Sequence, residues 1–222
     1  MKTLNSSELS TMTDLSTTLE EDGYGIKVLR LNDGSFLKLF RLKRIFSSAL
    51  LYPYAKRFAD NAKKLESLGI PTVRVIDLFD TIEPRRNCVH YHPLPGITLR
   101  ELYRSERSPM PHERVALLGK LLANLHDKGV YFRSIHLGNI VLTPDGELGL
   151  IDISDMKIQQ SPLSTRLRRR NFSHLIKGDD DRNSLHTGGP LGQLLLDSYV
   201  KACKRPHKRM TSALAHALGL AQ

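Results

Sequence analysis

Hydrophobic and polar positions alternate along residues 26–31 and 35–40, and this alternation predicts two paired β-strands. Asn32, Asp33 and Gly34 between them have the composition of a tight turn. Residues 52–68 instead repeat apolar side chains at steps of three and four, which predicts a helix ended by Gly69. Residues 73–79 and 88–92 predict two more strands. The first ninety residues are therefore expected to form a small sheet with one helix.

The pattern becomes mainly helical after residues 92–97, which we interpret as a linker. Thr98 and Glu101 have the spacing of a capping box at the start of a short helix. A second helix is predicted over residues 112–126, and a hairpin over 139–152 turns at Pro144-Asp145-Gly146. From residue 163 the pattern is mostly helical. The prediction is an α+β protein with two lobes: a β-rich N-lobe over 21–92 and a larger helical C-lobe over 93–222.

Residues 1–20 are rich in Ser and Thr and lack the apolar stretch of a secretion signal, so we expect a flexible tail. No run approaches 18 consecutive apolar residues, as a transmembrane helix would require. Cys88 and Cys203 match no metal-binding spacing, and reduced thiols of a cytoplasmic protein are the expectation.

The chain carries 33 Lys and Arg against 23 Asp and Glu, a net charge of +10 that favours polyanionic partners. The charge is densest over 201–209 and in a run of four arginines, which are Arg166, Arg168, Arg169 and Arg170. These runs predict either a site for a phosphorylated substrate or anionic membrane, or merely a solvated helix face. Nucleic acid is not an expected partner, because the chain has no Trp and no aromatic residues interleaved with the basic runs.

Lys38 is the first candidate for chemistry, because it shares a strand face with Phe36 and Phe40. A lysine among apolar neighbours requires an anionic partner, and ATP phosphates would provide one. The alternative is an edge-strand lysine whose amine reaches water. Gly23 and Gly25 lie just before this hairpin, where a loop covering phosphates would be expected, although such a pair also occurs in ordinary turns.

Residues 132–139 read F-R-S-I-H-L-G-N and follow the kinase catalytic-loop pattern H-R-D-L-x-x-x-N, with Arg133 and Asn139 matching. Downstream, Asp152 ends an apolar strand, as the metal-binding aspartate of a kinase does. Asn139 and Asp152 are therefore predicted to bind Mg²⁺ through oxygen atoms. The alternatives are a loop-capping asparagine and a strand-end turn.

With these motifs, residues 21–203 resemble the protein-kinase-like superfamily. They are most similar to the bacterial branch of lipopolysaccharide core sugar kinases, which act on heptose or Kdo and have relatives known as toluene-tolerance proteins. Further similarity lies in residues 68–72, 94–99, 125–130 and the basic helix 169–175. The resemblance implies ATP and Mg²⁺ bound between two lobes and phosphate transfer to a core sugar hydroxyl. It also implies a cytoplasmic protein that contacts the inner membrane peripherally.

Ser134 is the main departure from the pattern, because it replaces the aspartate that accepts the acceptor's proton. A serine hydroxyl is a poor base, and general-base catalysis contributes about 10²–10⁴-fold. His136 and Asp155 are the candidate substitutes, with a structural loop histidine as the alternative for His136. Two hypotheses follow: a slow or atypical kinase, or a pseudokinase that binds nucleotide and acts as a scaffold in envelope assembly.

The second departure concerns the helix over 52–68, where a kinase places a glutamate that pairs with the strand lysine. Phe58, Asp60 and Asn61 occupy the aligned positions, and Glu66 is displaced by about one turn. None of these residues is a clear match, so the sequence assigns no partner to Lys38.

Overall fold

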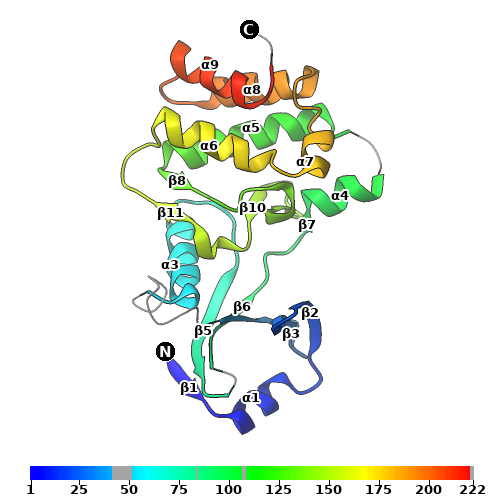
Figure 1. The fold of residues 1–222 in the computed structure, drawn as a ribbon, viewed down its shortest axis with the longest axis vertical. Coiled ribbons are helices and arrows are strands. Elements are labelled where there is room, and N and C mark those ends of the chain that lie inside the picture. The colour runs from blue at the N-terminus through cyan, green and yellow to red at the C-terminus, as the bar shows by residue number, and fades with distance from the viewer. Residues whose placement is uncertain (42–51, 84, 107–108, 221–222) are drawn as a thin grey trace. The chain divides into compact units, whose positions relative to one another are not determined.

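The structure is a computed structural model that describes residues 1–41, 52–83, 85–106 and 109–220. It divides into two compact units, which are shown with their elements in Figure 1. The first unit consists of residues 1–94 together with 153–155, and the second of 95–152 together with 156–222. The first unit contains a six-stranded sheet and the second contains most of the helices. The predicted α+β class, with a small β-rich part and a larger helical part, is confirmed.

The sheet of the first unit has the strand order β1-β5-β6-β4-β3-β2. Its strands are β1 Lys2–Leu4, β2 Thr17–Asp22, β3 Gly25–Arg30, β4 Phe36–Arg41, β5 Arg74–Thr81 and β6 Arg86–His92. The predicted hairpin is formed by β3 and β4, and Val28 pairs with Lys38 in its register. Asp33 stabilises the turn by accepting a hydrogen bond from the backbone N–H of Ser35 at 2.9 Å.

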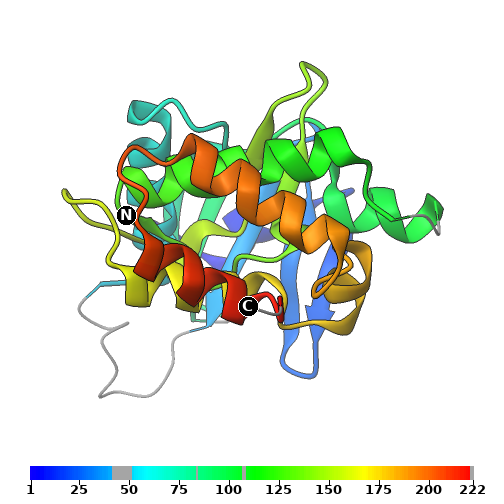
Figure 2. The same ribbon diagram turned by 90° about the horizontal axis from the view of Figure 1, so that it is seen from above.

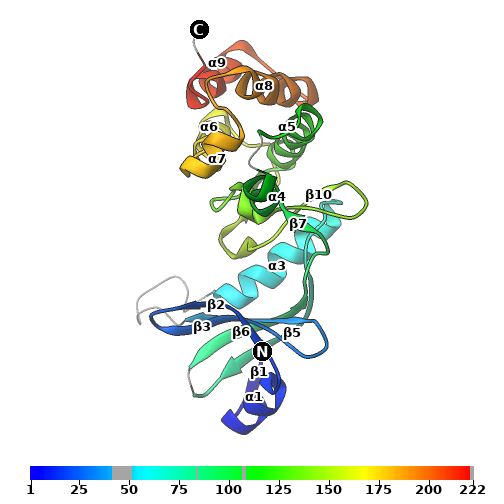
Figure 3. The ribbon, with the colours of Figure 1, turned by 90° about the vertical axis from the view of Figure 1, so that its right-hand side faces the viewer.

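The two faces of this sheet are covered by different helices. Leu37 and Leu39 on one face belong to an apolar cluster with Leu29 and Phe79. On the other face lies α3 (Tyr54–Ser67), whose Phe58 packs against Phe40 and Tyr91 with ring centroids 6.3 and 5.2 Å away. Figure 3 shows α3 and α1 on opposite sides of the sheet. Alternation along β4 therefore separates an apolar layer from the face that carries Lys38.

The N-terminal residues belong to the first unit, so the prediction of a flexible tail over 1–20 is wrong. β1 pairs in parallel with β5, and α1 (Ser6–Thr13) begins with a capping box between Asn5 and Glu8. The apolar side chains of Leu4, Leu9 and Met12 pack against the sheet cluster. Their burial attaches a segment whose Ser- and Thr-rich composition had suggested disorder.

The second unit is built around two packed helix pairs, α5 with α8 and α6 with α9, which Figure 2 shows from above. Its helices are α4 Leu99–Glu106, α5 His112–Asp127, α6 Thr165–Leu175, α7 Asp179–Ser184, α8 Pro190–Ala202 and α9 Lys208–Ala217. Its strands are β7 Ile97–Thr98, β8 Val130–Tyr131, β9 Ile140–Leu142, β10 Leu148–Leu150 and β11 Lys157–Ile158. Two 3₁₀ turns, η1 Leu137–Asn139 and η2 Ile153–Asp155, flank the β9–β10 hairpin, and η2 belongs to the first unit. No helix within the described ranges is long and apolar enough to cross a bilayer.

Local signals place the elements around the predicted catalytic loop. Thr98 and Glu101 form the predicted capping box, with Glu101 N–H bonded to the Thr98 hydroxyl at 3.1 Å. Gly129 follows α5 with a φ of +76°, and an added Cβ would lie 2.2 Å from the carbonyl oxygen of Gln159. Only glycine fits this position. The chain can therefore turn sharply from α5 into β8, which leads to the loop.

Both cysteines are buried free thiols, Cys88 in the first unit and Cys203 in the second. Burial raises the pKa of the Cys88 thiol to about 12. Because the thiolate is the reactive form, Cys88 is a packing residue and not a nucleophile.

Candidate active site

The glycine turn, which we define as Gly23, Tyr24 and Gly25, connects β2 to β3. Gly25 has a φ of +101°, a conformation that favours glycine. The N–H of Tyr24 donates to Asp22 at 2.9 Å, which lowers the pKa of that carboxyl, and Arg86 donates to the Tyr24 carbonyl at 2.8 Å. Tyr24 itself is 66% exposed. The turn thus lies in solvent and is held by these hydrogen bonds and by the Arg41 guanidinium, which lies 3.6 Å from the centroid of the Tyr24 ring.

Lys38 lies on β4 between β3 and β6, opposite Val28 and Val89 in the two registers. The prediction of its face is confirmed, because Leu37 and Leu39 are buried on the other side. Its ammonium nitrogen lies 5.7 Å from the centroid of the Phe40 ring. Because β4 has neighbours on both sides, the alternative of an edge-strand lysine is wrong.

The helix positions considered for the partner of Lys38 are occupied in different ways. Phe58 is buried among aromatic rings, and Asp60 accepts a hydrogen bond from the hydroxyl of Tyr52. Asn61 is buried and donates its side-chain amide to the carbonyl of Ile153 at 2.7 Å. This bond attaches α3 to η2, directly after Asp152.

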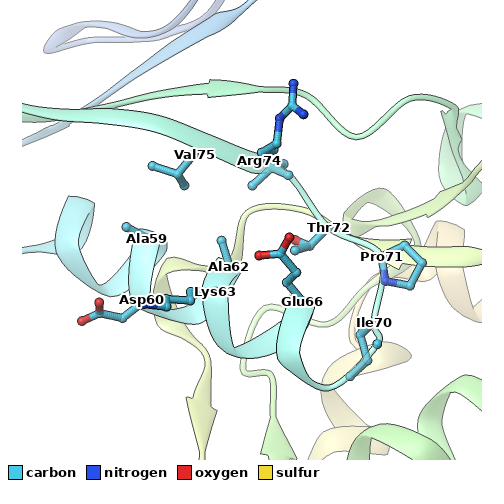
Figure 4. A pocket seen from close by; sticks show the side chains of 12 residues that line it. Ala59, Asp60, Ala62, Lys63, Glu66, Ile70, Pro71, Thr72, Arg74 and Val75 are labelled. Atoms are coloured by element: carbon cyan, nitrogen blue, oxygen red, sulfur yellow. The ribbon is translucent and has the colours of Figure 1, made fainter.

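A cavity of about 710 Å³ in the first unit lies along α3 and the segment that leads into β5. Figure 4 shows Asp60, Lys63 and Glu66 on its helix side and Pro71 and Arg74 on its strand side. None of the residues predicted for catalysis or for nucleotide, metal or anion binding lines it. The chemistry predicted from the sequence is therefore not located in this cavity.

The catalytic loop, residues 132–139, brings the two predicted metal ligands of the second unit close together. The side-chain amide of Asn139 donates to the carbonyl of Ser134 at 2.9 Å, which closes the loop. The carbonyl of Asn139 accepts from the N–H of Ile151 at 3.1 Å, so Asp152 follows immediately beside it. Because the amide nitrogen of Asn139 is already used, its Oδ1 is the atom that can bind a cation.

Asp152 adopts a left-handed backbone conformation with a φ of +51° and is partly exposed. Such a conformation is unfavourable for a residue with a side chain and is concentrated at functional sites. The backbone therefore turns sharply at Asp152, between β10 and η2.

The donor set at Asn139 and Asp152 fits Mg²⁺, which accepts one or two protein oxygens and completes its shell with water and substrate phosphates. In the part of the chain that the structure describes, no group of three or more His, Cys, Asp or Glu could hold a metal ion.

The remaining candidate residues of the loop differ in solvent exposure. Arg133 is exposed, whereas Ser134 and His136 are partly buried, and His136 directly precedes η1. Asp155 ends η2 and belongs to the first unit, whereas His136 belongs to the second. Their roles as substitute bases stay predictions.

A buried chain of hydrogen bonds supports the catalytic loop from the helical side. The side-chain amide nitrogen of Asn171 donates to the carbonyl of Phe132, so its oxygen faces His126. That oxygen can only accept, and the Nε2 atom of His126 therefore carries a proton and donates at 3.0 Å. Burial of His126 lowers its pKa to about 3, so the ring is neutral.

The same chain continues through Tyr199 to an ion pair. The Tyr199 hydroxyl donates to Nδ1 of His126 at 2.9 Å and accepts from Arg168 at 2.8 Å. Arg168 also pairs with Asp127 at 2.7 Å, and both side chains are 7% exposed. We call this set, Asp127, Arg168, Tyr199, His126 and Asn171, the buried relay. From Arg168 through Tyr199, His126 and Asn171, successive donors lead to the Phe132 carbonyl.

A second contact fixes the far end of the loop. Asp181 is 1% exposed and accepts two hydrogen bonds from Arg100, at 2.8 and 3.1 Å. It also accepts from the backbone N–H of Leu137 at 3.3 Å. The loop is thus held by side chains at both Phe132 and Leu137.

The prediction that Arg168 belongs to an anion-binding run is wrong, because its guanidinium is buried and paired with Asp127. Arg166, Arg169 and Arg170 are exposed on the same helix. Helical periodicity explains the difference, since Arg168 shares a face with the buried Phe172 and Leu175.

Sequence reasoning missed the supporting residues, including His126, Asn171 and Asp181. One signal was present for α6, where Arg168 and Asn171 fall on the apolar face of the helix. A polar side chain on such a face needs a buried partner. The identity of each partner depends on tertiary packing and has no local signal.

No protein-family model and no curated protein matches the chain. Among solved structures it is similar to WbdD in a co-crystal structure with the kinase inhibitor LY294002, with 15% identity and a TM-score of 0.46 over 82% of this chain and 43% of that chain. A 2.2 Å crystal structure of WbdD matches with 17% identity and a TM-score of 0.46, over 88% of this chain and 47% of that one. The chain spans less than half of the WbdD chains that it matches.

Proposed function

We propose that this chain is a kinase-like protein that binds Mg-ATP and transfers phosphate to a hydroxyl of a lipopolysaccharide core sugar, slowly or by an atypical route. The observation that carries the proposal is the convergence of Asn139 and Asp152. Asn139 bonds the carbonyl of Ser134 through its side-chain amide, and its own carbonyl accepts from the N–H of Ile151, the residue before Asp152. This arrangement supports the assignment of Asn139 and Asp152 to the metal-binding part of a kinase-like site.

Each predicted site residue has a defined part in the proposed reaction. Asn139 and Asp152 hold Mg²⁺, which offsets charge on the phosphates when it is bound. Lys38 contributes a positive charge from an interior strand toward the nucleotide phosphates. Ser134 can hydrogen-bond the acceptor hydroxyl but cannot take its proton effectively, so transfer relies on positioning and electrostatics.

Ser134 also supports a second function, a pseudokinase that binds nucleotide and acts as a scaffold or regulator in envelope assembly. Both functions require the Asn139 and Asp152 site. They differ in whether the acceptor is phosphorylated, and Ser134 is the residue that separates them.

Nucleotide binding is tested by thermal unfolding of the full chain with Mg-ATP, Mg²⁺ alone and ATP with a chelator. Mg-ATP at 100 times its Kd should stabilise the fold by about 2.7 kcal/mol, and Mg²⁺ alone should have little effect. Asp152→Ala should remove the shift. Asp145→Ala, which changes an exposed carboxylate in the turn of the same hairpin, should retain it. No shift for the unaltered protein at saturating nucleotide would exclude both functions.

Phosphate transfer is tested by mass analysis of core oligosaccharide incubated with ATP and the unaltered protein, Ser134→Asp or Ser134→Ala. For a handicapped kinase, Ser134→Asp should raise the rate by about 10²-fold or more. Nucleotide binding with a zero rate for both the unaltered protein and Ser134→Asp would favour the scaffold.

A further inference from the structure

The net charge of the chain resides almost entirely in two segments that are distant in sequence. Residues 156–178 contain six Lys and Arg, residues 198–222 contain five, and neither segment contains Asp or Glu. The rest of the chain holds 22 basic against 23 acidic residues. The charge of +10 is therefore a local property and not a general excess.

The fold brings the two segments together in the second unit. α6 packs beside α9, as Figure 2 shows, and Thr165 contacts His207 at 3.5 Å. Asp127 connects the two segments. One of its carboxylate oxygens accepts a hydrogen bond from Arg168, and the other accepts from the backbone N–H of Lys204. Because both oxygens of this buried carboxylate are already hydrogen-bonded, Asp127 does not neutralise the exposed cations.

The exposed basic residues of α6 and of the segment from Lys204 into α9 form what we call the basic face. Its members are Arg166, Arg169, Arg170, Lys204, Arg205, Lys208 and Arg209, all exposed. No acidic residue lies in either segment to pair with them. Single-sign charge of this kind raises the local concentration of anionic partners.

From this arrangement we propose that the basic face adsorbs to the surface of an anionic lipid bilayer. A discrete small anion would be bound by partly buried donors, whereas these seven side chains are all exposed over two elements. Such an array matches a broad, two-dimensional charge distribution, and each Lys or Arg near an anionic bilayer raises the affinity about fivefold.

The aromatic residues of the two segments argue against single-stranded nucleic acid as the occupant. Phe172 and Tyr199 are both 0% exposed and cannot stack on bases. Among the described residues, the exposed large hydrophobic side chains all lie outside these segments. The adsorption is therefore electrostatic without insertion, and it is independent of the proposed phosphotransferase activity.

The test is co-sedimentation of the nucleotide-free full chain with vesicles of phosphatidylcholine and phosphatidylglycerol, compared with vesicles of phosphatidylcholine alone. Binding should be specific for the anionic vesicles and should disappear at about 1 M salt, where the Debye length is about 3 Å. The triple variants R166E/R169E/R170E and K204E/R205E/K208E should each weaken binding by at least about tenfold.

The matched control reverses the same number of exposed charges elsewhere, in K56E/K63E/K64E on α3. It should bind anionic vesicles within about threefold of the unaltered protein, since electrostatic contributions outside the contact are screened. Equal loss in the control would overturn the proposal in favour of a net-charge effect. Equal binding to neutral vesicles, or binding to duplex DNA but not to anionic vesicles, would overturn it as well.

Discussion

The glycine turn and the catalytic loop, both predicted to act on the nucleotide, are held by opposite means. The turn lies in solvent, where hydrogen bonds from Tyr24 and Arg86 and the contact of Arg41 with the Tyr24 ring hold it. The loop is fixed at Phe132 by Asn171 and at Leu137 by Asp181, from within the protein. Buried hydrogen bonds are costly to break, whereas exposed ones can be replaced by water. The predicted metal ligand Asn139 is therefore expected to be held rigidly, and the turn is expected to be adaptable.

Arg168→Met is expected to have the largest effect of the changes that test this comparison. It leaves the buried carboxylate of Asp127 without its cationic partner, at a cost of about 3–5 kcal/mol in the free energy of unfolding. Arg169→Met, one residue away and exposed, should change it by less than about 0.5 kcal/mol. Urea unfolding measures both. If the two variants had similar free energies of unfolding, the ion pair between Arg168 and Asp127 would not stabilise the fold.

Asn171→Leu should have the next largest effect, roughly 2–4 kcal/mol, because it leaves Nε2 of His126 buried without its acceptor and removes one of two hydrogen bonds to the Phe132 carbonyl. It should also reduce the stabilisation by Mg-ATP, since the loop that carries Asn139 loses an anchor. Ser173→Ala on the exposed side of α6 serves as the control. If the variant were destabilised but Mg-ATP still stabilised it fully, the buried relay would not be needed for nucleotide binding.

Acidification should weaken the fold through His126. Its folded pKa of about 3 lies below the ordinary 6.5, so the unfolded chain binds a proton that the folded chain excludes between these values. Stability from this residue is complete above pH 6.5 and is lost as the pH falls, by about 1.4 kcal/mol per pH unit. Urea unfolding from pH 7 to 5 measures the slope. His126→Gln should have a shallower slope, and an equal slope would assign the loss to other groups.

Gly25→Ala should have the smallest effect, about 1 kcal/mol, because its φ of +101° is unfavourable for alanine. Gly23→Ala in the same turn has open space and no such strain, so it should change stability by less than about 0.5 kcal/mol. Thermal unfolding distinguishes the two. If Gly25→Ala cost as much as the relay variants, the turn would not be the adaptable region.

Much of the fold was predictable where local chemistry decides the structure. The turn at Asn32-Asp33-Gly34, the capping box of Thr98 and Glu101, and the helix stop at Gly129 follow from rules that act within a few residues. The N-terminal segment was not predicted, because its composition outweighed the apolar side chains of Leu4, Leu9 and Met12. These side chains become buried only against a sheet whose other strands come from residues far along the chain.

The candidate site likewise contains residues that local sequence predicts and residues that only distant contacts determine. Asn139 and Asp152 were predicted together because a short hairpin brings them together, and the loop pattern defines their spacing. Arg168 was assigned to the wrong class because charge alone does not distinguish the faces of a helix. The partners of His126 lie 45 and 73 residues away, a distance at which a sequence pattern carries no signal.

The first unit is discontinuous, because residues 153–155 return to it after the chain has entered the second. Asn61 on α3 receives its buried acceptor only from Ile153, 92 residues later. During synthesis, the sheet and α3 therefore emerge with one polar position still incomplete, and the small unit is finished only when residue 155 is available. A fragment ending at residue 94 would lack this closing contact and would leave the buried Asn61 amide without its acceptor.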